Sequence, residues 1–92
     1  MSEDHKPYNP EESKRIESAD MFVEDGRING SLAVSRSLGD FGYKDLESFK
    51  PRETAVTAWP DVKKVPLNSD VQFVLLACDG LWDIKSSKQA VN

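Results

Sequence analysis

The longest apolar run in the chain is Val71–Cys78, where seven of the eight residues are apolar. Successive side chains of a strand point to opposite faces, so this run would place apolar groups on both faces. A strand of that kind must be covered on both faces, which predicts a central strand of a layered fold. The run ends at Asp79-Gly80, where a carboxylate meets a glycine that frees the backbone to turn.

The segment from Pro10 to about Ala19 has the signals of a helix. Asn9 is a candidate N-cap, and proline suits the first helical position. Two glutamates follow at once, which favours the first turn of a helix because its dipole is positive there.

Two turn dipeptides, Asp25-Gly26 and Asn29-Gly30, predict a hairpin next. We favour Asp25-Gly26 as the tip, which would join Phe22–Glu24 to Arg27–Ile28. Both dipeptides contain residues that tolerate positive φ, and only one of them is needed as the tip.

The remaining stretches are less regular. Phe41–Thr54 shows no apolar periodicity and predicts a surface loop. Ala55–Leu67 predicts one or two short strands, which Pro60 and Pro66 would confine to edges or ends. Ser86 is a plausible N-cap for a final helix.

Composition limits the class of protein. Apolar residues make up 38% of the 92 residues, against about 45–50% in globular domains. The chain therefore contains few apolar residues that could cover a strand on both faces. This suggests that the chain is part of a larger domain. The net charge is −4 without a basic block, so nucleic-acid binding is not expected.

No signal peptide is visible, and no apolar run reaches the about 18 residues of a membrane span. The single cysteine, Cys78, falls inside the apolar run and predicts a buried, inert thiol in a reducing compartment. A soluble protein of the cytoplasm, or also of the nucleus, is expected, without a membrane partner.

Asp79 is the main candidate for chemistry. A carboxylate at a strand end can bind Mg²⁺ or Mn²⁺, which prefer oxygen ligands. The same pattern fits a simple turn or helix cap with no metal. A nucleotide-hydrolase carboxylate would require a glycine-rich phosphate loop, which is missing, and an aspartyl nucleophile would favour a second aspartate where Leu81 stands.

Several other residues allow both a structural and a functional interpretation. His5 could be a metal ligand, although a lone histidine in a proline-rich loop is more often structural. Arg27 and Arg36 could pair with a phosphate or form surface ion pairs. Trp59 and Trp82 are expected to be packing residues, because nothing in the sequence indicates an aromatic cage.

Taken together, four stretches resemble the metal-dependent serine/threonine protein phosphatases of type 2C. They are Asp4-His5-Lys6-Pro7 with the helix start after it, Arg27–Asp40, Pro60-Asp61-Val62, and Phe73–Asp83. Their order and spacing also match, and the resemblance covers nearly the whole chain.

The resemblance implies an α+β fold, a partial four-layer α-β-β-α sandwich, over residues 1–92. It implies a binuclear Mg²⁺ or Mn²⁺ centre whose activated water hydrolyses phosphoserine or phosphothreonine in protein substrates. Asp79 matches the family's metal-bridging aspartate, and Gly39-Asp40 is given a structural role. The implied class is a protein serine/threonine phosphatase.

The chain also departs from the family pattern. The N-terminal Asp-Gly-His-Gly segment and the C-terminal Asp-Asn motif, which carry other metal ligands, are absent, and Ser18-Ala19-Asp20 replaces a usual glycine pair. We therefore expect a partial catalytic domain whose 92 residues have no phosphatase activity alone. The alternative is a truncated or degenerate, non-catalytic homologue that acts as a phosphoprotein-binding or regulatory module.

Overall fold

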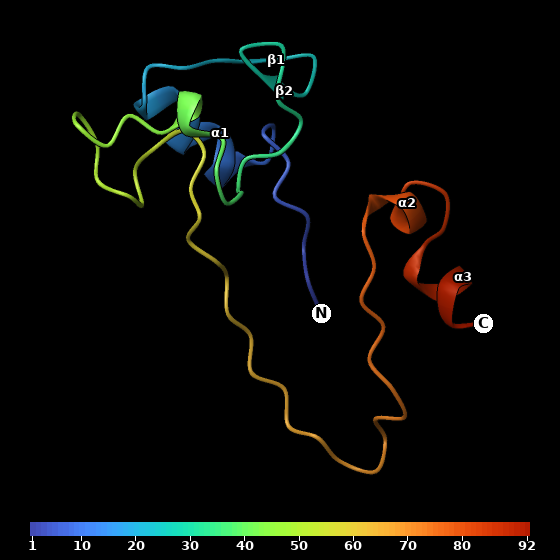
Figure 1. Cartoon of the computed structure of the whole chain (residues 1–92). Helices are drawn as coiled ribbons and strands as arrows, with labels where there is room; N and C mark the ends of the chain where they lie inside the picture. The colour runs from blue at the N-terminus through green and yellow to red at the C-terminus, as the bar shows by residue number, and fades with distance from the viewer.

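The computed structural model describes all 92 residues and divides them into a packed part and an extended part (Figure 1). The packed part, residues 1 to 57, holds helix α1 (Pro10–Ser18), strands β1 (Val23–Glu24) and β2 (Arg27–Ile28), and a 3-10 helix at Phe41–Tyr43. Beyond residue 57 the chain extends away from the packed part and then turns back. It ends in α2 (Asp79–Trp82) and α3 (Ser87–Val91). No helix has the length and apolar character needed to cross a bilayer.

Helix α1 confirms the predicted helix, with one difference at its start. Asn9 occupies the N-cap position with extended backbone, but its side chain makes no cap. Instead, Asn9 Nδ2 donates to the carbonyl of Asp4 at 2.7 Å. Glu12 and Ile16 are spaced four apart, so they share the helix face that packs inward, and both are buried.

The hairpin is also confirmed, including its tip. Strands β1 and β2 pair antiparallel with Val23 opposite Ile28. Asp25 and Gly26 have φ of 53° and 73°, as a two-residue turn with positive φ at both central positions requires.

Replacing Gly26 with alanine is expected to destabilise the hairpin. The left-handed conformation costs a residue with a Cβ about 1–2 kcal/mol, and the new Cβ would lie 3.4 Å from Tyr8 Cδ1. Gly42→Ala is the matched control, because Gly42 has no positive φ and nothing lies within 4 Å of the position that an alanine Cβ would take there. Equal urea midpoints for the two variants would contradict the prediction.

The apolar core lies between α1, the hairpin and a distant stretch of chain. Its five buried residues share one contiguous cluster: Ile16, Ala19, Ile28, Ala55 and Val56. Tyr43 and Phe49 are partly buried against it, and Thr54 is buried too. The prediction of a surface loop over Phe41–Thr54 is therefore wrong in part, because three of its residues pack inward without any regular spacing.

The strands predicted within Ala55–Leu67 are reduced to a single bridge. Thr57 pairs in parallel with Arg36: Ser37 N donates to Thr57 O at 3.1 Å, and Thr57 N donates to Ser35 O at 3.3 Å. After Thr57 the segment has no neighbouring strand, so the rest of the predicted pairing does not form.

The predicted central strand at Val71–Cys78 is not formed either. The segment has no strand partner, and its side chains are exposed, with Leu76 at 85%. Cys78 is exposed as well, which corrects the expected buried thiol. Both errors have one physical cause, because the packed part of this chain provides no layer that reaches the segment.

The final helix begins as predicted. Gln89 N donates to Ser86 Oγ at 3.2 Å, and Ser86 N donates to Gln89 Oε1 at 2.9 Å. These reciprocal bonds form a capping box, which satisfies two amides that the first turn would leave unpaired.

Candidate functional site

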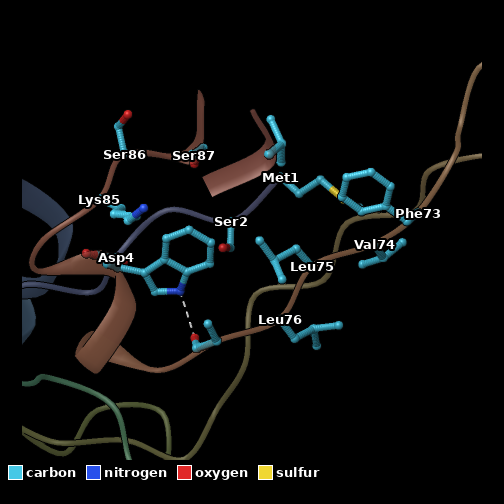
Figure 2. Close-up of a pocket in the computed structure, with 13 residues that line it drawn as sticks. Met1, Ser2, Asp4, Phe73, Val74, Leu75, Leu76, Lys85, Ser86 and Ser87 are labelled. Atoms are coloured by element: carbon cyan, nitrogen blue, oxygen red, sulfur yellow. Dashed lines mark hydrogen bonds between the residues drawn. The ribbon is translucent and has the colours of Figure 1, made fainter. Parts of the chain in front are cut away.

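Asp79 stands at the first position of α2, directly after the extended apolar segment. The turn is held from both sides: Asp83 N donates to Asp79 O at 2.9 Å, and Trp82 Nε1 donates to Ala77 O at 2.7 Å (Figure 2). The Asp79 side chain is exposed at this turn. The predicted position of Asp79 at the end of a central strand is therefore not formed in this chain, because the segment before it is extended but unpaired.

The residues of this chain do not by themselves fit a two-cation centre. Nowhere do three or more His, Cys, Asp or Glu side chains gather closely enough to bind a metal ion. A divalent cation held by one carboxylate keeps most of its water ligands, so Asp79 alone provides only a small part of a binding site. Its role as a metal ligand stays a prediction.

An open cavity of about 560 Å³ lies between the apolar segment, Val71–Cys78, and the last helices, and Asp79 is not among the residues that line it. Figure 2 shows the Met1 side chain directed at Phe73, with Leu75 next to them. Trp82 is partly buried here, which agrees with its predicted packing role. Hydrophobic residues of the apolar segment line the cavity together with the polar side chains of Ser2, Lys85, Ser86 and Ser87.

The buried carboxylate of Glu12 accepts hydrogen bonds from three side chains. Arg36 binds it with two parallel bonds, Nε to Oε1 at 2.7 Å and Nη2 to Oε2 at 2.8 Å. Ser35 Oγ donates to Oε1 at 2.7 Å, and Arg15 Nη1 donates at 3.2 Å. We call these four residues, Glu12, Arg15, Ser35 and Arg36, the Glu12 network.

The charge state of the network follows from these contacts. Burial alone would raise the pKa of Glu12, but the hydrogen bonds from Arg36 and Ser35 and the charges of Arg15 and Arg36 outweigh it. The pKa of Glu12 is lowered from 4.5 to about 2. The bond to Glu12 likewise raises the pKa of Arg36. The pair is therefore ionised throughout the physiological range.

Arg36 extends the network to the surface. Its Nη1 donates to Asp61 Oδ1 at 2.8 Å and to the carbonyl of Trp59 at 3.2 Å. Asp61 Oδ2 also lies 2.9 Å from His5 Nε2. Hydrogen bonds from His5 and then Arg36 lower the pKa of Asp61. His5 and Arg36 thus join protein groups to one another, and the structure supports the structural interpretation of both.

The sequence analysis did not identify Arg15 as a candidate functional residue. In the structure it connects α1 to the backbone at Ser35 and at Thr54-Ala55. Its Nε donates to Thr54 O at 3.1 Å, and Nη2 donates to Ser35 O and Ala55 O at 2.8 and 3.2 Å. The sequence feature that could have indicated an ion pair of Arg15 with Glu12 is their spacing, since residues three apart on a helix are neighbours.

The two remaining arginines, Arg27 and Arg52, are not part of the Glu12 network. Arg27 Nη1 donates to the carbonyl of Ser31 at 2.9 Å, and the Arg52 guanidinium lies 3.7 Å from the ring centre of Trp59. Such stacking of a cation on an aromatic ring contributes about 0.5–1 kcal/mol at an exposed site. Arg15, Arg36 and Arg52 line one surface hollow together with Asp61, and phosphate binding by Arg27 stays a prediction.

Gly39-Asp40 forms a tight turn. Both residues have positive φ, 79° and 51°, and Asp40 Oδ2 accepts a hydrogen bond from Ser37 Oγ at 2.6 Å. The aspartate is among the residues that tolerate this backbone region because its side chain bonds locally. The geometry agrees with the structural role expected for this pair.

Comparison with known proteins identifies the class. The family model of protein phosphatase 2C matches residues 1–92. Protein phosphatase 2C homolog 2 of Schizosaccharomyces pombe is 52% identical over 91 residues, 99% of this chain and 25% of the relative. Probable protein phosphatase 2C 6 of Paramecium tetraurelia is 49% identical over 92 residues, all of this chain and 31% of the relative.

A solved structure agrees with these relatives. A phosphatase from a pathogenic strain of Toxoplasma gondii superposes with a TM-score of 0.64 and 44% identity, over 66% of this chain and 19% of that one. The chain belongs to the protein phosphatase 2C family. It spans between a quarter and a third of the length of the two relatives above. The mixed α and β character of the expected fold is confirmed.

Proposed function

We propose that this chain forms part of the catalytic domain of a metal-dependent protein serine/threonine phosphatase. The observation that carries the proposal is the identity of about half of all positions, along the whole chain, to phosphatases 2C. No observation favours the non-catalytic alternative. Phosphoproteins are the substrate class that this family implies.

Within that domain, the contribution of this chain would be one carboxylate ligand, Asp79. Bound Mg²⁺ or Mn²⁺ would supply Lewis-acid activation of water for hydrolysis of a phosphoserine or phosphothreonine ester. The other ligands of a binuclear centre would come from outside these residues, since this chain holds no cluster of ligands. The four-layer sandwich and a cytoplasmic or nuclear location belong to the same proposal.

A chimera tests the proposal directly. This chain would replace the matching 91 residues of the S. pombe relative, with which it shares 52% of positions. We expect Mn²⁺-dependent release of phosphate from a phosphothreonine peptide. Asp79→Ala should lower that rate at least about a hundredfold, because even residues that only orient metal ligands contribute about 10–100-fold.

Asp70→Ala is the matched control, an exposed aspartate in the turn before the apolar segment. It should leave the rate within about twofold, since surface substitutions have small effects. Circular dichroism would establish that each chimera is folded. A folded chimera whose turnover equals that of its Asp79→Ala variant would overturn the proposal.

A further inference from the structure

A hollow on the packed part lies between α1 and the loop that leads to Thr54. Its volume is about 460 Å³, within the range of about 300–1,000 Å³ of small-molecule sites. Arg15 Nε donates to Thr54 O at 3.1 Å, which joins the helix to the end of the loop. The exposed residues that line the hollow are all polar: Glu11, Lys14, Ser18, Arg52 and Glu53.

Arg52 is held in position but has no anionic partner. Its guanidinium lies 3.7 Å from the ring centre of Trp59, so the indole covers one of its flat faces. The ion pairs of this chain use His5, Arg15 and Arg36 as their cations, and Arg52 takes part in none of them. The N–H groups of a guanidinium lie in its plane, so stacking leaves them free to bind an anion with two parallel bonds.

Lys14 adds a second charge from the helix side of the hollow. It is exposed and forms no ion pair either. Arg15, the third cation that lines the hollow, is already paired with Glu12 at 3.2 Å. Two cations without a partner therefore line the same hollow, and the hydroxyl of Ser18 can donate a further hydrogen bond.

The anion that matches this set of donors is a phosphate group. A phosphate monoester carries about −1.5 to −2 charges at pH 7 and has three strong acceptor oxygens. A carboxylate carries one charge, so it would leave one of the two cations without a counter-charge. Glu11 and Glu53 also line the hollow, and their charges oppose an anion. They should limit the affinity without removing the two donors.

We propose that this hollow, here called the Arg52 hollow, binds a phosphate group through Arg52, Lys14 and Ser18. The group belongs either to a phosphorylated side chain of another protein or to a small phosphate compound. Asp79 is not among the residues that line the hollow, so the site differs from the proposed metal ligand. The proposal goes beyond the proposed function and does not depend on it.

NMR titration of the 92-residue chain in metal-free buffer provides the test. With inorganic phosphate, we expect saturable shifts of the amides of residues 14–18 and 52, with a Kd on the order of 1 mM, as two charge-assisted hydrogen bonds would give. A peptide with one phosphoserine distinguishes the two sources. Binding at least about tenfold tighter than inorganic phosphate, an added 1.4 kcal/mol or more, identifies a protein ligand, and equal or weaker binding identifies a small phosphate compound.

Substitutions test the two cations. Arg52→Gln should raise the Kd at least about tenfold, because it removes charged hydrogen bonds. Arg52→Lys should raise it at least about threefold, since lysine keeps the charge but loses the paired bonds.

Lys14→Gln and Lys64→Gln form a matched pair, because Lys64 is equally exposed but lies in the extended part of the chain. The first should raise the Kd at least about threefold, and the second should stay within about twofold. Glu11→Gln should have the opposite sign and lower the Kd, because it removes a repelling charge. Circular dichroism would establish that each variant keeps its helix.

Several outcomes would overturn the proposal. These are no saturable binding of either phosphate probe, a Kd that Arg52→Gln leaves unchanged, equal effects of Lys14→Gln and Lys64→Gln, or tighter binding of phosphate by the Lys14 variant. Binding of the unphosphorylated peptide as tight as that of the phosphate probes would also overturn it. Neither a metal nor turnover enters this measurement, so an inactive chimera would reject the proposed function alone, and absent binding would reject the Arg52 hollow alone.

Discussion

Glu12→Gln is expected to lower the free energy of unfolding by about 3–5 kcal/mol, the usual result of removing one partner of a buried ion pair. The Glu12 side chain is almost fully buried and receives both Arg36 bonds. Glutamine has nearly the same shape, so the loss would come from removing the buried counter-charge of Arg15 and Arg36, which leaves Arg36 only its pairing with the exposed Asp61. Urea unfolding followed by circular dichroism measures it.

Glu11→Gln is the control for this prediction. Glu11 stands beside Glu12 in the first turn of α1 but is exposed. Its charge interacts with the helix dipole alone, which is worth about 0.3–1 kcal/mol. Equal losses for the two variants would show that the Glu12 network does not hold the packed part together.

Acid unfolding provides a second readout of the same group. The pKa of Glu12 is depressed in the folded state, from 4.5 to about 2. A depressed carboxyl pKa stabilises the fold above the unfolded value, and this stabilisation is lost as pH falls through the folded value. The contribution of Glu12 should thus be complete above about pH 4.5 and disappear towards pH 2. Glu12→Gln should be less sensitive to pH in that interval.

Ile28→Ala is expected to cost about 2–5 kcal/mol, the range for truncating a fully buried isoleucine. Ile28 is completely buried between the hairpin and α1, in a core of five residues. Such a small core has little stability to lose, because small domains bury a modest share of their surface. The variant should therefore lose most of the ellipticity of α1 at room temperature.

Ile84→Ala tests whether burial is the cause. Ile84 is 74% exposed, so the same truncation leaves no cavity there and should change stability by less than about 0.5 kcal/mol. Thermal unfolding of both variants under one set of conditions makes the comparison. A smaller loss for Ile28→Ala than for Ile84→Ala would contradict the assignment of the core.

Sequence patterns located those elements whose causes are local. Helix α1 follows from proline and glutamates at its start, the hairpin from Asp25-Gly26, and α3 from the capping residue Ser86. Each signal acts over at most a few residues, so it keeps its meaning whatever the rest of the chain does.

The Glu12 network escaped prediction because its parts are far apart in sequence. Arg36 is 24 residues from Glu12, and the carbonyl of Thr54 is 39 residues from Arg15. Nothing about a glutamate in a first helical turn distinguishes a buried one from an exposed one until the fold brings arginine to it. The apolar segment was misjudged for a related reason, since a strand forms only where pairing partners exist.

The reach of Arg15 has a consequence for how the packed part assembles. A nine-residue helix is too short to persist on its own in water, and Arg15 finds carbonyl acceptors only when residues 35, 54 and 55 arrive. Formation of the helix and closure of a loop of 40 residues are therefore one event. The kinetics of folding should show a single cooperative phase, with its rate set by chain closure over that separation.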